Sequence, residues 1–309
     1  MEKIAIRDAY GSALKELGWV NEKVVALEAD VGGSTKSALF GKEFPHRYYE
    51  VGISELNMVN MAAGMARVGL IPFVNTFSAF LATRGSDPIQ SLIGYDKLNV
   101  KLAGTYVGLS DSYDGASHHA ITDVAFLRAI PGMVVITPSD AVMTKKAVFA
   151  AAEYEGPVYL RLSRAPAPVM YKEKNEFFIG KGIVYRKGKD VTIVSMGTLL
   201  SKAVAAADQL EVEGIHAEVI DIPTVKPLDE EMIIQSARKT GAVVCVEENS
   251  IWGGLYSAVT ETLSANYPVP VLGIGATDYA ESGDYEQLLR KYGYSEENII
   301  SKVKELIKR

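Results

Sequence analysis

One glutamate stands where it could exchange protons with a ligand. Glu55 follows the short apolar run Val51–Ile53 and precedes a segment rich in small residues, Ala62–Ala66. This order predicts the end of a strand, a turn, and a helix that carries Glu55 in its first turn. The helix N-terminus favours the carboxylate, whereas burial among apolar residues raises its pKa. Glu55 could therefore share a proton with a heterocyclic nitrogen, or it could simply be an acidic residue well placed in a first turn.

The helix expected after Glu55 has a candidate cap and a candidate buried face. Ser54 precedes the helix, and a serine hydroxyl can accept a hydrogen bond from an unpaired amide of the first turn. Apolar side chains at helical spacing predict one face that packs on the core. These side chains are Leu56, Val59, Ala63 and Ala66. With Gly64 they predict a closely packed helix.

A loop with two adjacent histidines is the second candidate for chemistry. The segment Asp114–His119 reads DGASHH, and histidines can donate hydrogen bonds or carry protons near neutral pH. Metal binding fits less well, because adjacent histidines point apart and no cysteine joins them. We expect no metal site built by this chain alone. Taken singly, each histidine could also be a solvated loop residue.

Two aromatic residues and two arginines complete the candidates. Phe77 and Phe80 are three residues apart, so on a helical turn they could form a wall against a flat ligand, or they could belong to the core. Arg7 and Arg164 flank the ends of predicted strands, where a guanidinium can bind a phosphate with two hydrogen bonds. A single arginine of this kind is more often a surface ion-pair partner.

The composition excludes several classes of protein. The chain has 309 residues, with 48 % hydrophobic and 23 % charged residues, which is ordinary for a soluble globular protein. The net charge of −6 argues against a nucleic-acid surface. The single cysteine, Cys245, lies in an apolar run and can form no disulfide within the chain. No apolar run approaches the ~18 residues of a membrane span, and the N-terminus lacks a signal-peptide core. We expect a cytoplasmic protein that binds neither membrane nor nucleic acid.

In the first half of the chain, short apolar runs alternate with helical patterns. This alternation predicts a mainly parallel sheet covered by helices on both faces. The predicted strands are Val24–Glu28, Leu70–Val74, Lys97–Gly104, Val134–Thr137 and Val158–Leu162. The predicted helices include Ile6–Leu17, Ala120–Ala129 and Asp140–Tyr154.

The composition changes after Arg164, where a polar, proline-rich crossing begins and runs to about Asp190. A second alternation of strands and helices follows, and Pro223–Pro227 predicts a loop within it. The predicted strands are Val191–Ser195, Ala217–Ile222, Ala242–Glu247 and Val269–Ile274. The predicted helices are Ser201–Glu213, Leu255–Asn266 and Glu296–Lys308. The predicted fold class is α/β with two domains, 1–168 and the smaller 190–309, joined by a linker at 169–189.

Several motifs, in the same order, resemble the C-terminal half of transketolase. VGISELNM and NMAAGMA resemble the family's segment around its cofactor-activating glutamate, and NTFSAF resembles its aromatic segment. DGASHHAITD resembles the family's DGxTHQ loop, and RLSRAP its arginine-bearing strand end. VEENSIWGGL and IGATDYAESGDYEQLLRKYG resemble its third domain. The resemblance covers Lys3–Ile307. It implies a doubly wound pyrimidine-binding domain followed by a transketolase C-terminal domain.

The resemblance implies thiamine diphosphate chemistry. Glu55 matches the glutamate that bonds to the aminopyrimidine ring and shifts it to the imino tautomer. That tautomer takes the proton from the thiazolium carbon and creates the nucleophilic ylide. Phe77 and Phe80 match the wall around the pyrimidine, and Asp30 and Val31 fall on the loop near the cofactor.

The resemblance also implies substrate contacts. His118 matches a residue that contacts a substrate hydroxyl or the intermediate, and Asp114 matches a partner of the donor's hydroxyl. Arg7, Ser34 and Arg164 match positions that hold a sugar phosphate. The implied reaction moves a two-carbon ketol unit between phosphorylated ketose and aldose sugars, as in the pentose phosphate pathway.

Three positions depart from the family pattern. Leu56 stands where many relatives have histidine, and Ser110 where transketolases often carry a substrate-binding histidine. Thr83 replaces an aromatic residue at the outer wall of the pyrimidine site. These departures leave the sugar substrate open.

No segment resembles the GDG…N motif with which the family's first domain binds Mg²⁺ or Ca²⁺ and the diphosphate. The resemblance therefore implies one half of a split enzyme, completed by an N-terminal partner subunit, with two copies of each chain. The beta subunit of a 2-oxo acid dehydrogenase and a deoxyxylulose-phosphate synthase relative are alternatives, against which the paired arginines and the DGASHH loop favour phosphosugars. A non-catalytic regulatory subunit is a third alternative, and the retained Glu55 weighs against it.

Overall fold

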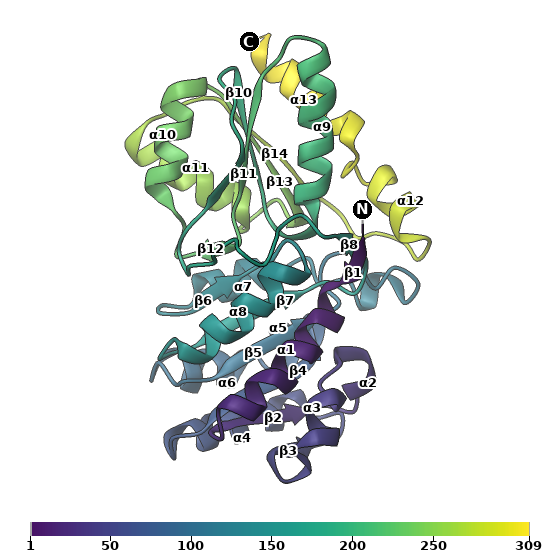
Figure 1. The fold of residues 1–309 in the computed structure, drawn as a ribbon, viewed down its shortest axis with the longest axis vertical. Coiled ribbons are helices and arrows are strands. Elements are labelled where there is room, and N and C mark those ends of the chain that lie inside the picture. The colour runs from purple at the N-terminus through teal and green to yellow at the C-terminus, as the bar shows by residue number, and fades with distance from the viewer. Residues whose placement is uncertain (1, 309) are drawn as a thin grey trace.

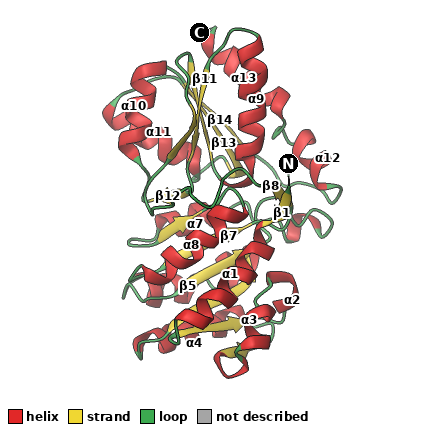
Figure 2. Ribbon diagram, viewed as in Figure 1, coloured by secondary structure: helices red, strands yellow, loops and turns green. Residues whose placement is uncertain are grey.

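Two α/β units make up the computed structural model, which describes residues 2–308. In Figure 1 the unit formed by the N-terminal half lies below and the unit formed by the C-terminal half lies above, with the chain's N-terminal end at their junction. In both units helices flank a central sheet (Figure 2). No helix in the described part of the chain is both long and apolar enough to cross a membrane. The α/β class with parallel sheets agrees with the prediction.

The first unit is built on a seven-stranded sheet with the order β12-β6-β7-β5-β4-β2-β3. All neighbouring strands in it are parallel except β12, which pairs antiparallel with β6. The strands are β2 (Val24–Glu28), β3 (Tyr48–Glu50), β4 (Ile71–Phe77), β5 (Lys101–Thr105), β6 (Val134–Ile136), β7 (Val158–Leu162) and β12 (Thr224–Lys226).

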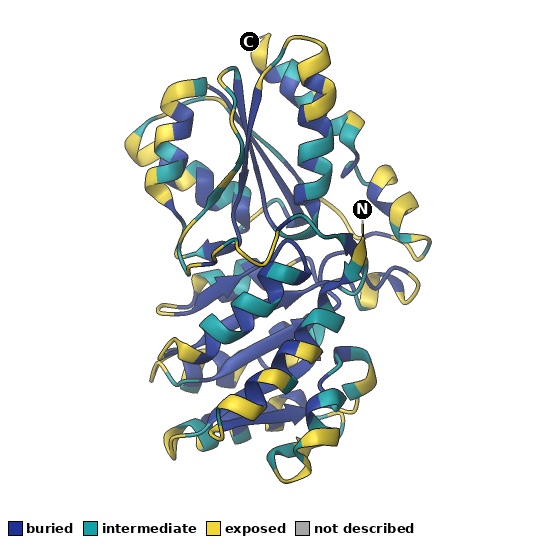
Figure 3. Cartoon of the chain, in the orientation of Figure 1, coloured by how far each residue is buried: buried dark blue, intermediate teal, exposed yellow. Residues whose placement is uncertain are grey.

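Strands β2, β5 and β7 are buried along their whole length, and β4 is buried up to Phe77, as mainly apolar runs require (Figure 3). Helix α1 (Ile6–Val20) packs against α3 (Ala38–Glu43) and α8 (Ala141–Glu153). Helix α4 (Glu55–Arg67) contacts α5 (Ser78–Arg84) and α6 (Ser86–Pro88). The remaining elements of this unit are α2 (Gly32–Thr35), η1 (Pro45–Arg47), η2 (Ile89–Gly94), η3 (Gly115–Ser117) and α7 (Asp123–Ala129).

The second unit has a five-stranded sheet with the order β14-β13-β10-β11-β9, parallel except for β9. Its strands are β9 (Ile183–Arg186), β10 (Val191–Ser195), β11 (Ala217–Asp221), β13 (Val243–Ser250) and β14 (Val271–Ala276). Its helical elements are η4 (Gly197–Leu199), α9 (Leu200–Val212), α10 (Glu230–Thr240), α11 (Leu255–Asn266), α12 (Tyr285–Lys291) and α13 (Glu296–Ile307). Helix α9 packs with α13, and α10 packs with α11.

Two pairings connect the ends of the first unit to later parts of the chain. Strand β1 (Lys3–Ala5) pairs antiparallel with β8 (Pro166–Pro168). Strand β12 comes from the stretch Pro223–Pro227, which we predicted to be a loop and which instead adds an edge strand to the first sheet. Strand β9 lies within the range 169–189 that we expected to be a connection, and it pairs with β11.

The start of helix α4 differs in detail from the prediction. Ser54 precedes the helix, but its hydroxyl donates to the Val51 carbonyl oxygen at 2.9 Å and caps no amide. Leu56 is 50 % exposed, and Ala66 is only partly buried. The buried side chains of the helix are those of Glu55, Met58, Val59, Ala62 and Ala63. Gly64 faces open space rather than a neighbouring backbone.

Candidate functional site

An aromatic cluster forms where strand β4 ends and helix α5 begins. Phe77 is the last residue of β4 and Phe80 lies in the first turn of α5, with 6.0 Å between their ring centroids. The His118 ring lies 5.9 Å from Phe77 and 5.0 Å from Phe80, edge-on to both. Tyr106, which follows β5, lies 4.3 Å from Phe77. The parallel pairing of β4 with β5 brings these loops to one edge of the sheet, where open α/β sheets bind ligands.

Glu55 lies beside this cluster, at the start of α4, with only 4 % of its side chain exposed. Arg84, at the end of α5, donates a hydrogen bond from Nη1 to Glu55 Oε1 at 2.9 Å. The same guanidinium stacks on Phe80, with Cζ 3.9 Å from the ring centroid. The Arg84 guanidinium, a planar group with N–H donors, therefore stacks on Phe80 and donates a hydrogen bond to Glu55 at the same time. These are the two contacts that an aminopyrimidine ring would need, so the residues fit such a group.

Two arginines lie against the ring of Tyr106, which also contacts Phe77. Arg7 Nη1 donates to the Ser34 carbonyl oxygen at 3.1 Å and to the Tyr106 hydroxyl. The guanidinium carbons of Arg7 and Arg164 lie 5.2 Å and 5.3 Å from the Tyr106 ring centroid. Tyr106 has a φ of +64°, a left-handed conformation that is unfavourable for a side chain of this size. Such strained residues gather at functional sites. Ser34 contacts Arg7 through its carbonyl oxygen, whereas its hydroxyl has no side-chain hydrogen-bond partner among residues 2–308.

The loop that carries His118 adds two carboxyl groups. Ligand atoms of Asp111, Asp114 and His118 all lie within 4.8 Å of one another. Asp111 is buried and its Oδ1 lies 3.6 Å from Arg164 Nη1. Burial, together with the neighbouring Asp114, raises the pKa of Asp111 to about 7. His118 Nδ1 shares a hydrogen bond of 2.9 Å with the Ser117 hydroxyl. The positive charges of Arg164 and Arg7 disfavour a metal cation among these groups.

The loop with Asp30 and Val31 is fixed from the strand side. Glu28, at the end of β2, accepts hydrogen bonds from the Thr35 hydroxyl at 2.7 Å and from the Val31 amide at 3.3 Å. Burial raises the pKa of Glu28 to about 7. The Asp30 amide donates to Glu50 Oε1 at 2.8 Å. Asp30 and Val31 thus lie at the same sheet edge as the aromatic cluster, in contact with the ends of β2 and β3.

The second unit holds the loop Leu109–His119 in place. Glu248, in β13, accepts the Leu109 amide at 2.6 Å on one carboxyl oxygen and the Tyr285 hydroxyl at 2.7 Å on the other. Gly108 has a φ of +58°, and a Cβ there would lie 2.4 Å from Glu248 Oε1. The close approach of Glu248 therefore requires a glycine.

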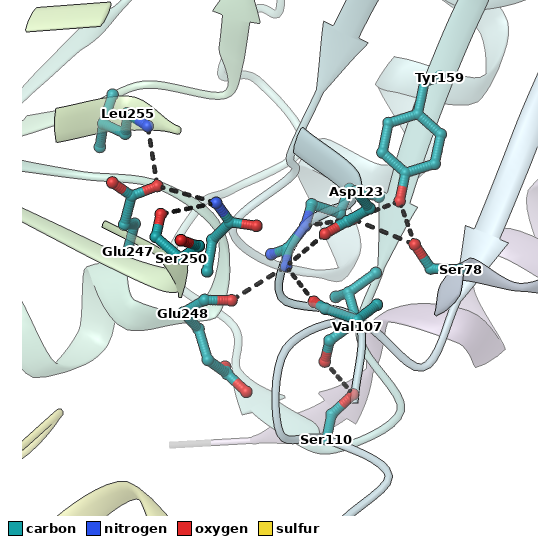
Figure 4. A network of polar contacts seen from close by, with 12 residues as sticks. Ser78, Val107, Ser110, Asp123, Tyr159, Glu247, Glu248, Ser250 and Leu255 are labelled. Atoms are coloured by element: carbon teal, nitrogen blue, oxygen red, sulfur yellow. Dashed lines mark hydrogen bonds and ion pairs between the residues drawn. The ribbon is translucent and has the colours of Figure 1, made fainter. Parts of the chain in front are cut away.

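A buried arginine, Arg161, completes the connection between the units, and Figure 4 shows two of its partners, Asp123 and Glu248. Arg161, in β7, donates to Asp123 Oδ2 at 2.8 Å, to the Ala120 carbonyl at 3.0 Å and to the Glu248 carbonyl at 2.9 Å. Asp123 in turn accepts the Ser78 hydroxyl at 3.1 Å. Because Ser78 follows Phe77 directly, this network links β13 of the second unit to the aromatic cluster.

The structure assembles most of the predicted residues into one continuous site. Phe77, Phe80 and His118 contact one another, and Arg84 joins Phe80 to Glu55. Tyr106 connects Phe77 to the arginine pair. The sequence interpretation gave no role to Arg84, Tyr106 or Asp111. Arg84 was detectable, because it follows Phe80 by four residues on a helix and so shares its face. Tyr106 and Asp111 lie in irregular loops, where spacing predicts no direction.

The fold and this site define a class: two-unit α/β proteins whose first parallel sheet carries a ligand site at its carboxyl edge. Two family profiles match the chain, "Transketolase, pyrimidine binding domain" over residues 2–169 and "Transketolase, C-terminal domain" over residues 180–299. The chain belongs to the transketolase family, which confirms the resemblance seen in its sequence.

Three similar proteins place the chain more narrowly within the family. A "Putative transketolase C-terminal section" of Methanocaldococcus jannaschii is 42 % identical over 98 % of this chain and 96 % of the relative. A "6-deoxy-6-sulfo-D-fructose transketolase subunit" of a Clostridium species is 39 % identical over 100 % of this chain and 96 % of the relative. A solved structure described as "Split gene transketolase, inactive beta4 tetramer" is 46 % identical over 99 % of both chains, with a TM-score of 0.92. This chain is therefore a C-terminal subunit of the transketolase type.

Proposed function

We propose that this subunit takes part in transferring a two-carbon ketol unit between phosphorylated ketose and aldose sugars, with thiamine diphosphate as cofactor. One observation carries the proposal: Arg84 stacks on Phe80 while it donates a hydrogen bond to the buried Glu55. The pyrimidine ring of the cofactor needs the same stacking surface and the same acceptor. Arg84, 47 % exposed, has room to turn away when the ring enters.

We call Glu55, Phe77, Phe80, Asp30 and Val31 the cofactor end of the site, and in this proposal each has one task. Bound thiamine diphosphate supplies the nucleophilic carbon that carries the two-carbon unit between sugars. Glu55 holds a proton at a pyrimidine nitrogen, and its burial keeps water from competing for that proton. Phe77 and Phe80 fix the plane of the ring, and the loop with Asp30 and Val31 lines the approach to it.

We call His118, Asp114, Arg7 and Arg164 the substrate end of the site. Tyr106 connects it to the cofactor end, because it contacts Phe77 and both arginines. His118 and Asp114 hold hydroxyl groups of the sugar, with His118 against the aromatic rings and therefore nearest to the reacting carbon. Arg7 and Arg164 bind the terminal phosphate, and the backbone of Ser34 holds Arg7 in position. Charge-assisted hydrogen bonds to a phosphate of this kind are worth about 1.5–3 kcal/mol each.

We propose an N-terminal partner subunit that binds Mg²⁺ or Ca²⁺ and the diphosphate. The printed names of two relatives, a "C-terminal section" and a "split gene" protein, support a division of the enzyme between two chains. Two copies of each subunit about a two-fold axis would complete it, in the cytoplasm.

A reconstitution experiment tests this proposal. We expect the purified chain to be inactive alone, to associate with itself, and to bind thiamine diphosphate weakly. Adding the N-terminal partner, Mg²⁺ and thiamine diphosphate should produce ketol transfer from xylulose 5-phosphate. Calorimetry on the chain alone provides the decisive contrast, because tight, Mg²⁺-dependent cofactor binding without a partner would contradict the split site.

A second candidate substrate class is favoured by one observation. The site places the carboxyl of Asp111 beside Arg164, which lowers the positive charge available to a doubly charged phosphate. One relative is named for a sulfonated sugar, whose terminal group carries a single charge. Donor assays with fructose 6-phosphate and 6-deoxy-6-sulfofructose compare the two classes. Pyruvate and branched 2-oxo acids in the same assay test the oxo acid dehydrogenase alternative.

A further inference from the structure

One buried carboxyl gathers both ends of the loop that follows strand β2, which we call the β2 loop (residues 29–37). Glu28, the last residue of β2, is fully buried and accepts hydrogen bonds from two donors at each end of this loop. The donors are the amides of Ala29 at 3.0 Å and Val31 at 3.3 Å on Oε1, and the hydroxyls of Thr35 at 2.7 Å and Ser37 on Oε2. The carboxyl is therefore satisfied on both oxygens, and it ties the start of the loop to its end.

The β2 loop needs this support because its backbone is unfavourable near both ends. Asp30 has a φ of +61° and Lys36 a φ of +69°, in the left-handed region that is uncommon for residues with a side chain. Such conformations persist only where the surrounding structure fixes them. The four donors to Glu28 are the residues directly before and after these two positions in the chain. The carboxyl thus stabilises both turns of the loop.

The middle of the β2 loop reaches a residue of the substrate end. The Ser34 carbonyl oxygen accepts a hydrogen bond from Arg7 Nη1 at 3.1 Å. Beside it, Lys36 Nζ lies 3.2 Å from the Asp8 carboxyl, so the loop contacts two successive residues in the first turn of α1. An arginine side chain has many rotamers when it is free. The loop therefore sets the direction in which the Arg7 guanidinium points.

We propose that Glu28 is a positioning residue for the terminal phosphate of the sugar, and that it acts through the β2 loop and Arg7. The inference rests on the proposed function, because it takes Arg7 as a phosphate-binding group. With the loop held in place, Arg7 meets the phosphate already oriented, so less rotamer entropy is lost when the sugar binds. With the loop loosened, Arg7 keeps its charge but loses its fixed direction. Only donors that carry a phosphate then bind more weakly.

Thr35→Val tests the proposal, because valine keeps the shape of a fully buried side chain and removes a hydroxyl that Glu28 accepts. The enzyme assembled with its partner is assayed with saturating thiamine diphosphate at pH 8, above the pKa of about 7 to which burial raises Glu28. We expect the KM for xylulose 5-phosphate to rise roughly threefold to tenfold. The KM for hydroxypyruvate, a donor without a phosphate, and the kcat for both donors should not change. Thr35→Ser, which keeps the hydroxyl, should retain the wild-type KM.

Two further variants separate positioning from a general loss of structure. Thr144→Val is the matched control, because Thr144 is also fully buried in the first unit and its hydroxyl donates to the Asp140 carbonyl oxygen at 2.6 Å within helix α8. It should leave both KM values unchanged. Arg7→Ala completes a double-mutant cycle: once Arg7 is absent, Thr35→Val should raise the KM for xylulose 5-phosphate no further.

Equal increases in KM for both donors, or additive effects of Thr35→Val and Arg7→Ala, would overturn the inference in favour of a purely structural role for Glu28. An unchanged KM in Thr35→Val, where Arg7→Ala raises it, would also overturn the inference and leave the proposed function standing. If Arg7→Ala changes neither KM, the phosphate role of Arg7 in the proposed function fails and the inference fails with it.

Two measurements cover the remaining cases. If a thermal melt shows that Thr35→Val does not fold, Ser37→Ala removes the other hydroxyl donor to Glu28, and the same outcomes apply. If the wild-type enzyme turns over neither donor, the proposed function fails. The calorimetric Kd for inorganic phosphate, measured on the same variants and in the same cycle, then decides whether Glu28 acts through Arg7: a Kd that Thr35→Val leaves unchanged would contradict the inference.

Discussion

At the scale of single residues, Glu55 is the side chain on which the proposed chemistry depends. It is buried at the N-terminus of α4, and Arg84 satisfies its charge in the free subunit. An ion pair in which one partner is half exposed contributes about 0–1 kcal/mol, so a ligand can displace Arg84 at small cost. The pair thus keeps a buried carboxylate compatible with the folded chain, and in the proposed function a ring nitrogen of the cofactor would take the place of the guanidinium.

We expect Glu55→Gln to leave the fold intact and to remove most of the turnover of the assembled enzyme, by roughly 10²–10⁴-fold. Glutamine keeps the shape and a hydrogen bond, but it cannot exchange the proton. Steady-state rates measure the effect, and a thermal melt verifies folding. Glu43→Gln, an exposed residue at the end of α3, is the matched control and should keep the wild-type rate. A rate near that of wild type in Glu55→Gln would refute the role assigned to Glu55.

The sequence predicted the placement of individual side chains only where a regular strand or helix fixes the direction in which they point. Phe77 and Phe80 follow from a strand end and the next helical turn, and the structure places them together. The prediction for Ser54 was wrong, because Gly52, with φ +72°, turns the chain so that the hydroxyl reaches the Val51 carbonyl instead of an amide. Asp111 was not foreseen, since its environment arises from two loops that are 53 residues apart in the chain.

At the scale of elements, the loop Leu109–His119 depends on a strand from the other unit. Glu248 of β13 satisfies the Leu109 amide, and Gly283 donates its amide to the Ser112 carbonyl oxygen at 2.8 Å. The second unit therefore shapes the substrate end without contributing a side chain to the proposed chemistry.

We expect Glu248→Ala to loosen this loop and to lower kcat about tenfold or more, because the buried Leu109 amide loses its acceptor at a cost of about 1–3 kcal/mol. Hydrogen exchange at residues 109–119 should rise together with the loss of rate. Tyr285→Phe is the control: it removes the other partner of Glu248 and leaves the Leu109 contact in place. Unchanged hydrogen exchange at these residues in Glu248→Ala would show that the loop is ordered without the Glu248 contact.

The elements themselves were predictable wherever burial is uniform. Val24–Glu28, Val158–Leu162 and Val191–Ser195 are strands with the predicted bounds, because a continuous apolar run can only be buried on both faces of a sheet. The prediction of the buried face of α4 was less accurate. Leu56 is apolar and fits the helical spacing, which suggested a core contact, but its side chain is exposed. Strand β12 was missed because Pro223 and Pro227 flank it, and prolines usually indicate a loop.

At the scale of the whole molecule, several buried carboxyl groups make stability depend on pH. Burial raises the pKa of Glu28, Asp221, Glu247 and Glu248 to about 7, from ordinary values of 3.8 to 4.5. An acid whose pKa is raised on folding favours the folded state in its protonated form. Its contribution is fully present below the unfolded pKa and is lost as the pH rises through the folded pKa.

We therefore expect the free energy of unfolding to fall as the pH rises from about 5 to 8, with roughly 1–3 kcal/mol from each such group. Denaturant unfolding at pH 5.5, 6.5 and 7.5 measures this slope. Asp221→Asn, which replaces a carboxyl that accepts the Ser139 and Tyr171 hydroxyls, should reduce the slope. A stability that increases over this range would contradict the prediction.

Strand β12 also restricts where the coding sequence of this protein could be interrupted. The strand lies beyond residues 169–189, yet it covers the edge of the first sheet by pairing with β6. A reading frame ended within that range would yield a first unit with β6 as an unprotected edge, open to pairing with other chains. It would also leave the Arg161 guanidinium without the Glu248 carbonyl. The two units thus have separate sheets but depend on each other structurally, so a recombinant made between relatives would have to exchange them together.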